Sequence, residues 1–335
     1  MGTCDYPILD AGALYRCFNG ADQPGRLPEL CLGLLSEQKK TWPAAAAGYE
    51  SLRCVKEREI ACRGFSVRVQ YNPARIRSTL AVVEEKDVSR RACFLCPANL
   101  PEEQKGILYR KEYLILCNPM PVFSSHFTIS HLAHRPQGLA GAVAALFQLM
   151  SDFGPGASIL YNGPACGASA PDHLHFQAAP SGLMPIEKEI RGKQKLLRRR
   201  PGGVSVIRTE GMGRPVVILD GAGPAAVGDA LQELVKALGG VLPTDRSPMI
   251  NLICLRQGRT YTVLLFPRAK HRPDAFYLKG DDRLAISPAV VEMGGIMVTP
   301  IEKDFERLDA PSVERIYSEV SLPQEIVERA VDAMG

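Results

Sequence analysis

The stretch "PDHLHFQAAP", residues 171–180, alternates polar and apolar side chains along the chain. Successive side chains of a β-strand point to opposite faces, and neighbours on one face lie about 6–7 Å apart. His173, His175 and Gln177 therefore share one face of a predicted strand, while the leucine and phenylalanine between them form an apolar face. An ordinary half-exposed strand of an antiparallel sheet would have the same mixture of polar and apolar residues. Chemistry on this face needs support from residues elsewhere.

A pair of cysteines upstream gives that support. Two residues separate Cys93 from Cys96, a spacing that lets two thiolates bind one tetrahedral metal ion. Two buried thiols or a redox pair would have the same spacing. A metal ion would need two further ligands, and the chain offers six histidines, at positions 126, 131, 134, 173, 175 and 271. Because the cysteines are followed by clustered histidines and then by HxH, the whole series indicates a metal site more specifically than the pair does.

The composition is that of an ordinary globular protein. The chain has 335 residues, of which 46% are hydrophobic and 23% are charged, and its net charge is only +4. It is therefore no polycation built to bind nucleic acid. No stretch approaches the roughly 20 apolar residues of a membrane span, and the first residues do not resemble a secretory signal. Most of the ten cysteines stand alone in apolar or mixed segments, as reduced thiols do, so a cytoplasmic location is expected.

Two series of predicted elements follow one another in the same order: strand, strand, helix, strand, strand. Alternating and helical hydrophobic patterns predict the first series at 112–118, 126–131, 138–153, 157–162 and 173–178. The second series is predicted at 204–209, 215–220, 225–240, 249–255 and 260–270. We interpret this as a degenerate internal duplication in an α+β fold. In it, "HLHFQAAP" and "YTVLLFPR" occupy equivalent places, and only the first kept histidines.

The duplication predicts four segments. Residues 1–64 form a helical and irregular extension, 65–185 a catalytic half with the metal site, 186–202 a basic connector, and 203–335 a degenerate second half with C-terminal helices. The basic run at 188–200 is typical of a solvated helix face, or alternatively forms a cationic rim for phosphorylated substrates. No aromatic residue lies within it to stack on bases, which disfavours nucleic acid. Arg268, Lys270, His271 and Arg272 either reach a phosphate or simply end a strand.

Three motifs resemble one protein superfamily. They are "CFLCPAN" (93–99), "CNPMPVFSSHFTISHLAHRPQ" (117–137) and "YNGPACGASAPDHLHFQ" (161–177). Together they are similar to the transferase branch of the histidine-triad superfamily, which includes galactose-1-phosphate uridylyltransferases, diadenosine tetraphosphate phosphorylases and GDP-hexose phosphorylases. Hydrolases of the superfamily end the motif in a third histidine, whereas transferases have a glutamine there, as in Gln177. The resemblance covers residues 65–180 and continues weakly to about residue 300.

The resemblance implies roles for individual residues. His175 matches the nucleophile, and Gln177 matches the glutamine that holds the phosphoryl oxygens. The matching zinc ligands are Cys93, Cys96, His134 and His173, with His131 as the alternative to His134. The substrate-binding residues that it implies are Asn72, Arg75, Arg77, Asn118, Asn162 and Ser169. The segment from Ser169 to the motif departs from the uridylyltransferase pattern, and no match to their hexose-binding elements or second metal site is found. The phosphorylases are therefore the better match.

The implied activity is transfer of a nucleoside monophosphate group through a covalent nucleotidyl-histidine. The donor would be a nucleoside diphosphate sugar or a dinucleoside polyphosphate, and the acceptor phosphate or a sugar 1-phosphate. Two alternatives remain: a hydrolase of the same nucleotides, and a non-catalytic, zinc-stabilised nucleotide-binding module. A zinc protein that binds nucleic acid rests only on the cysteine pair and the basic run. The resemblance also implies a homodimer and gives no reason to expect a nucleic-acid or membrane partner.

Overall fold

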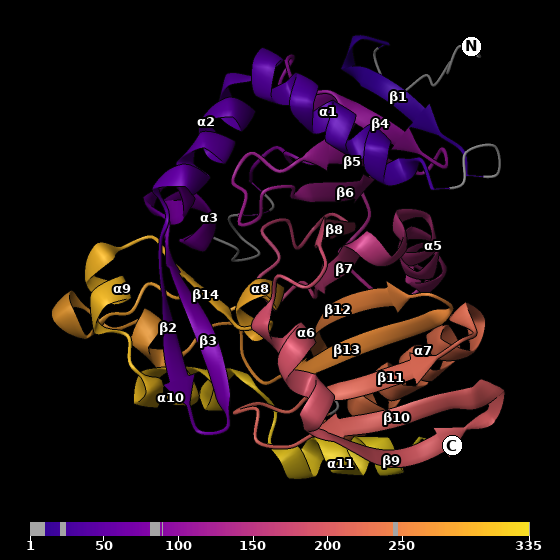
Figure 1. Ribbon diagram of the computed structural model, residues 1–335, viewed down its shortest axis with the longest axis vertical. Coiled ribbons are helices and arrows are strands. Elements are labelled where there is room, and N and C mark those ends of the chain that lie inside the picture. Colours follow the sequence, from indigo (N-terminus) through magenta and orange to yellow (C-terminus); the bar gives the residue numbers. More distant parts are fainter. Residues whose placement is uncertain (1–10, 21–24, 81–87, 89, 244–246, 335) are drawn as a thin grey trace.

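The fold is built on one mixed sheet of eleven strands, which runs through the molecule from top to bottom in Figure 1. The computed structural model describes residues 11–20, 25–80, 88, 90–243 and 247–334. All neighbouring strands of the sheet are antiparallel except β1 and β4. In spatial order the strands are β1 (Leu14–Phe18), β4 (Gly106–Tyr109), β5 (Tyr113–Cys117), β6 (Phe127–His131), β8 (His175–Pro180), β7 (Ala157–Asn162), β12 (Met249–Gln257), β13 (Thr260–Arg268), β11 (Val217–Gly221), β10 (Val204–Thr209) and β9 (Gln194–Arg200).

The order of the strands confirms the α+β class and the two degenerate halves. Strands of the first half lie in the order β5-β6-β8-β7, and those of the second half continue as β12-β13-β11-β10. The second order is the first one reversed, so the halves meet where β7 pairs with β12 and are related by an approximate two-fold axis there. Strands β8 and β13 consequently occupy equivalent places, as the two similar element series predict.

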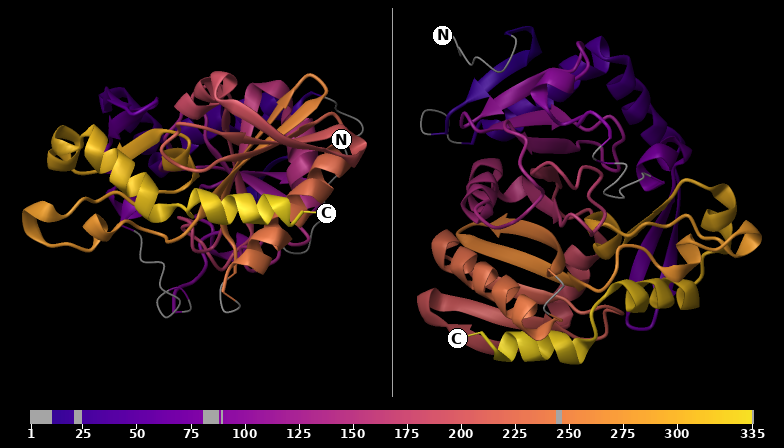
Figure 2. Two further views of the ribbon diagram at one scale, coloured as in Figure 1. Left: turned by 90° about the horizontal axis from the view of Figure 1, so that it is seen from below. Right: turned by 180° about the vertical axis from the view of Figure 1, so that it is seen from behind.

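Long amphipathic helices cover one face of this sheet. Helix α5 (Val143–Phe153) buries Val143, Leu146, Phe147 and Met150, which recur every three or four residues and so form one apolar stripe. Helix α7 (Pro224–Val241) starts with a proline at its first turn, where no backbone N–H is needed. Both helices share a core with α1 (Leu27–Thr41), α2 (Pro43–Ser51) and α11 (Gln324–Asp332). Figure 2 shows α7 lying across the sheet when the molecule is seen from behind.

A second core lies on the other face, where a smaller sheet packs. Its strands are β14 (Ile296–Thr299), β3 (Phe65–Tyr71) and β2 (Lys56–Cys62), with β14 and β3 parallel. The helices on this side are α3 (Ile76–Thr79), α6 (Pro185–Glu189), α8 (Val290–Met293), α9 (Glu302–Arg307) and α10 (Ala310–Val320). The described part of the chain contains no helix that is long and apolar enough to cross a membrane.

Two predicted segments contain more strand than the sequence indicates. Within residues 1–64, where helix and irregular structure are expected, the structure adds β1 and β2 to the expected helices. The prediction that the basic run at 188–200 forms a solvated helix face is also wrong. Most of that run is β9, which forms the edge of the large sheet and pairs with β10. Positive side chains on an edge strand oppose pairing with another chain. The four segment boundaries themselves stay a prediction.

Arg268, at the end of β13, is a buried structural residue. Its side chain is only 1% exposed and donates hydrogen bonds to the Asn251 side chain and to four backbone carbonyls, which belong to Lys270, His271, Pro288 and Val320. These carbonyls lie on segments far apart in the sequence, so one guanidinium ties the loops after β13 and before α8 to the sheet. The sequence left two roles open for this basic cluster, contact with a phosphate or the end of a strand, and Arg268 has the second.

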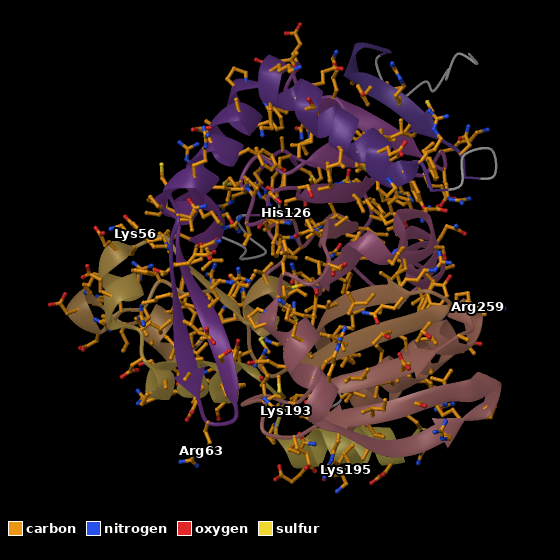
Figure 3. The ribbon with its side chains drawn as sticks, in the orientation of Figure 1. Lys56, Arg63, His126, Lys193, Lys195 and Arg259 are labelled. Carbon is orange, nitrogen blue, oxygen red and sulfur yellow. The ribbon has the colours of Figure 1, made fainter. Side chains whose placement is uncertain are left out.

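We expect Arg268→Leu to lower the free energy of unfolding by about 3 kcal/mol or more, because it leaves several buried carbonyl groups without donors. Arg259→Leu is the matched control, since Arg259 is exposed at the periphery of the molecule (Figure 3). That control should change stability by less than about 0.5 kcal/mol. Urea unfolding followed by circular dichroism measures both values. Equal stability of the two variants would contradict the role given to Arg268.

Candidate active site

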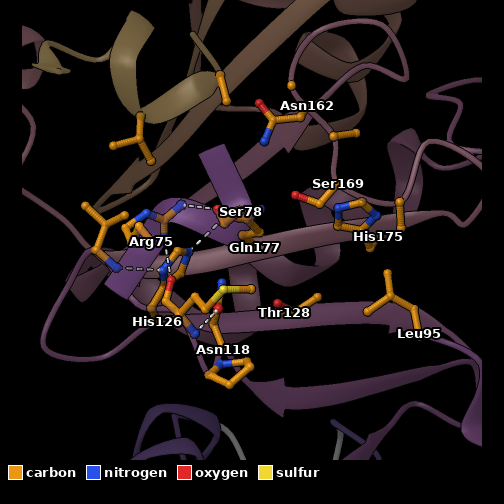
Figure 4. A pocket seen from close by; sticks show the side chains of 18 of the residues that line it. Arg75, Ser78, Leu95, Asn118, His126, Thr128, Asn162, Ser169, His175 and Gln177 are labelled. Atoms are coloured by element: carbon orange, nitrogen blue, oxygen red, sulfur yellow. Dashed lines mark hydrogen bonds between the residues drawn. The ribbon is translucent and has the colours of Figure 1, made fainter. Parts of the chain in front are cut away.

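A cavity of about 360 Å³ opens beside β8, on the face of the large sheet opposite α5 and α7. Its wall includes predicted site residues from several elements, and Figure 4 shows many of these side chains around a common centre. The predicted residues that line it are Arg75, Asn118, Asn162, Ser169, His175 and Gln177. The second half contributes residues 271, 272, 287, 289, 291 and 292. The cavity is therefore shared by the two halves.

His175 lies in this cavity with one ring nitrogen already occupied. Its Nδ1 is 2.8 Å from the carbonyl oxygen of His173, and because a carbonyl only accepts, Nδ1 must carry the proton. The lone pair is then on Nε2. Burial lowers the pKa of His175 to about 4, so the ring is neutral near pH 7. The Gln137 side chain holds the strand here, accepting from the His175 backbone N–H and donating to the His175 carbonyl.

Gln177 lies two residues further along the same strand and on the same face. Phe176 points the other way, into the core beneath α5. The Gln177 Oε1 is 2.8 Å from Nε2 of His126, a buried side chain that also lines the cavity. The predicted alternation is thus confirmed from His175 to Gln177, and it brings a neutral imidazole and an amide to one wall. His173 lies before the start of β8 and outside the cavity wall, so it does not share this face as the sequence predicts.

Two asparagines complete the polar wall. The Asn162 Oδ1 accepts hydrogen bonds from the Asn251 side chain and the Val290 backbone N–H, both of which belong to the second half. Its amide nitrogen therefore remains as the donor on the cavity side (Figure 4). Asn118 lines the cavity as well and fixes the following turn through its Oδ1, which accepts from the Met120 N–H. The exposed Ser169 points its hydroxyl into the same space (Figure 4).

The early Asn/Arg segment contributes one of its three predicted residues. Arg75 lines the cavity and donates to the Met120 carbonyl and the Ser78 hydroxyl, while its buried Nε has no partner among the residues that the structure describes. Asn72 is buried outside the cavity wall, where its side chain caps a short turn by accepting from the Ala74 N–H. Arg77 is exposed and lies outside the wall too. The structure therefore brings Arg75 to the site, but not the other two.

The four residues that the resemblance implies as metal ligands form a cluster. Their donor atoms lie within 4.8 Å of one another, and the residues are Cys93, Cys96, His134 and His173. Sulfur-to-nitrogen distances are 3.3 Å for Cys93–His173 and 3.2 Å for Cys96–His134. Ligands around a tetrahedral ion, bound at about 2.0–2.3 Å, are separated by roughly 3.5 Å. The donor set and its spacing fit a metal ion.

The ring of His173 is oriented for a metal. Its Nε2 is 2.7 Å from the His131 carbonyl and must donate to it, which leaves the lone pair of Nδ1 facing the cysteine sulfurs. His131 itself is not a member of the cluster, and its Nδ1 contacts the backbone of Ala133 at 2.9 Å and 3.0 Å. Between the two histidines left open by the sequence, the cluster contains His134. None of its four members lines the cavity.

Some residues of the site had no assigned role in the sequence. In the sequence analysis, His126 is named only among the six histidines, and Gln137 appears only as the last residue of the motif at 117–137. Trp42 lines the cavity from the segment between α1 and α2, although it lies before the region of resemblance. The signal that would have found His126 is its place directly before β6, the strand that pairs with β8.

Comparisons with known proteins bear on the fold. The family model described as a domain of unknown function (DUF4922) matches residues 34–180, and the model "GDPGP1-like, C-terminal domain" matches residues 226–332. No curated protein sequence matches the chain significantly. The yeast Ap4A phosphorylase Apa2 has the same fold, with 15% identity and a TM-score of 0.59 over 86% of this chain and 97% of the yeast chain.

Two further structures are similar at lower scores. The yeast Ap4A phosphorylase Apa2 in complex with Ap4A has 11% identity and a TM-score of 0.55, over 86% of this chain and 97% of that chain. An ADP-glucose phosphorylase from Arabidopsis thaliana with bound ADP-glucose has 12% identity and a TM-score of only 0.39, over 80% and 100%. The GDPGP1-like match and the fold shared with Ap4A phosphorylase confirm the resemblance of this chain to the transferase branch of the histidine-triad superfamily.

Proposed function

We propose that this protein is a nucleotidyltransferase or phosphorylase in which His175 carries a nucleoside monophosphate group. The observation that carries the proposal is the state of His175: a neutral ring, with its proton on Nδ1 and its Nε2 lone pair beside Gln177 in the cavity. A neutral imidazole nitrogen attacks phosphorus readily and later leaves from it, so one difficult displacement becomes two easier ones.

The first step would form a bond from His175 Nε2 to the α-phosphorus and break the bond from that phosphorus to its bridging oxygen. The leaving group departs as an anion: a sugar 1-phosphate from a nucleotide sugar, or a nucleoside polyphosphate from a dinucleoside polyphosphate. In the second step an oxygen of the acceptor attacks the α-phosphorus, and the bond to nitrogen breaks. Gln177 would donate its amide N–H to the non-bridging oxygens, where negative charge is concentrated in both steps. Arg75 would add a positive charge on the same wall.

The donor that we propose is a dinucleoside polyphosphate or a nucleotide sugar, and the acceptor an anion such as phosphate or a sugar 1-phosphate. Support for the class of donor comes from the yeast Ap4A phosphorylase Apa2, which has the same fold and was solved in complex with Ap4A. Support for transfer comes from Gln177, whose amide neither gives up nor accepts a proton and so does not activate water. Hydrolysis of the same nucleotides is the second candidate.

We propose that the Cys/His cluster binds zinc in a structural role. Two thiolates and two imidazoles are a donor set that zinc prefers in closed tetrahedral sites. The cluster lies outside the cavity wall, so the ion would not contact the substrate. It would instead fix His173, and with it the start of the strand that carries His175.

A covalent intermediate is the first expected outcome. Incubation of the protein with a nucleotide donor labelled at the α-phosphate should leave acid-labile label on the protein, because a phosphorus–nitrogen bond breaks in acid. His175→Gly should remove the label, and added imidazole should restore turnover by filling the vacated space. Measurement is by gel filtration at neutral pH and scintillation counting after short incubation, and acid treatment of the same sample should release the label. Wild-type protein that stays unlabelled with nucleotide sugars and dinucleotides alike, while turning them over, would contradict the covalent route.

The products distinguish transfer from hydrolysis. With phosphate present, transfer of the nucleotidyl group gives a nucleoside diphosphate, whereas attack by water gives the monophosphate. Phosphorus NMR should show the diphosphate as the main product, with a share that rises with phosphate concentration. A product mixture dominated by monophosphate at every phosphate concentration would favour the hydrolase.

Metal content tests the cluster separately. Purified protein should contain about one zinc per chain, and Cys93→Ser should lower that content and the thermal stability together, because metal binding contributes to folding. Cys54→Ser is the matched control, since Cys54 is an exposed free thiol outside the cluster. Inductively coupled plasma mass spectrometry gives the stoichiometry. Identical zinc content in both variants would exclude Cys93 as a ligand.

A further inference from the structure

Helix α2, which lies before the region of resemblance, holds the loop that carries His126. Tyr49 of α2 is 5% exposed, and its hydroxyl donates to the His126 carbonyl at 2.8 Å. The same hydroxyl accepts from the His126 backbone N–H at 3.2 Å. One side chain of the N-terminal segment thus fixes both backbone groups of a residue in the cavity wall.

The packing of α2 against this wall is close. A Cβ atom on Gly48, the residue before Tyr49, would lie 1.9 Å from the Pro119 carbonyl oxygen, so glycine is needed for the approach. Trp42, directly before α2, lines the cavity itself. The helix therefore forms part of the structure behind the site, and a shift of α2 would move residues 118–126.

The ring of His126 is held in one tautomer. The Val122 N–H donates to its Nδ1 at 3.3 Å, so Nδ1 carries the lone pair and the proton lies on Nε2. That Nε2–H donates to the Gln177 Oε1 at 2.8 Å. Burial lowers the pKa of His126 to about 4, an effect that the nearby charge of Arg75 increases and the bond to Gln177 opposes. The ring therefore stays neutral from pH 5 to 8 and keeps this arrangement.

The tautomer of His126 determines the orientation of the Gln177 amide. Because its Oε1 accepts from His126, its Nε2 hydrogens are the groups left for a ligand in the cavity. The reversed amide would place an N–H donor against the N–H donor of His126 and turn an oxygen toward a phosphate oxygen. Both contacts are repulsive, so the histidine selects the amide orientation that can bind an anion.

We propose that Tyr49 and His126 are positioning residues, which act in series to present the Gln177 amide N–H groups to the phosphoryl oxygens of the substrate. The proposal rests on the proposed function, because Gln177 must contact the transferred group for its orientation to matter. It gives helix α2 a part in the reaction, although α2 lies before the three sequence motifs that carry the resemblance. Figure 3 shows His126 in the interior of the molecule, between the N-terminal helices and the second half.

Turnover of single and double variants tests the series. Tyr49→Phe removes only the hydroxyl and should lower kcat about tenfold, the effect of losing roughly 1.4 kcal/mol of orientation, with KM changed less than twofold. In a Gln177→Leu background the same substitution should lower kcat no further. Tyr261→Phe is the control. The Tyr261 hydroxyl also makes a partly buried hydrogen bond, to Ser151, but Tyr261 lies outside the cavity wall. Its kcat should equal that of the wild type.

Additive losses in the double variant, or a Tyr49→Phe effect confined to KM, would overturn the proposal. Thermal unfolding of each variant separates loss of orientation from loss of fold, since Tyr49→Phe should retain a cooperative transition. If that variant unfolds, His126→Gln provides the same comparison: it should lower kcat in the wild-type background and leave Gln177→Leu unchanged.

An NMR measurement tests the arrangement without reference to activity. Long-range nitrogen–proton correlation spectra of the histidine rings should show His126 with its proton on Nε2 from pH 5 to 8. In Gln177→Leu, the preference for this tautomer should weaken. A proton on Nδ1, or a charged ring at pH 6, would overturn the series of contacts. The expected tautomer in a protein that forms no nucleotidyl intermediate would instead leave the positioning intact and remove the proposed function.

Discussion

The arrangement of the site depends on two hydrogen bonds from imidazole N–H groups to backbone carbonyls. His173 donates to the carbonyl of His131, and His175 donates to the carbonyl of His173. Each donation fixes the tautomer and leaves the opposite nitrogen with a lone pair. The two residues are only two positions apart, at and just before the start of β8, yet one lone pair faces the cysteine sulfurs and the other faces the cavity. Two chemically identical side chains thus present their free nitrogens to different surroundings because of the backbone carbonyls that they contact.

The second half of the sheet keeps the architecture of the first and supports its site. Its Asn251 and Val290 both bond to Asn162, which lets Asn162 face the cavity with its amide nitrogen. Arg268 fixes the loop that contains His271, a further residue of the wall. In the place equivalent to β8, strand β13 carries no histidine pair. One half therefore carries the histidine pair, and the other holds the wall in place.

The sequence predicts the parts of the site that depend on local pattern. The alternation in β8 and the short cysteine spacing are local, so both are read correctly from the chain. Spacing did not separate His131 from His134, because they are only three positions apart in the chain. The three-dimensional arrangement does, since His134 and not His131 lies with the cysteines. The roles of Tyr49 and His126 depend on contacts across 77 residues, which no periodicity records. The basic run formed a strand because β10 offered it a partner.

The pairing of β7 with β12 has a consequence for motion. Many enzymes made of two similar lobes bind their substrates by closing the lobes about a hinge. Here a continuous ladder of backbone hydrogen bonds joins the halves, from Ser158–Leu255 to Asn162–Asn251. Swinging them apart would break that ladder in the centre of the core. A ligand would therefore meet a cavity whose sheet wall is already formed, with no rotation of one half against the other.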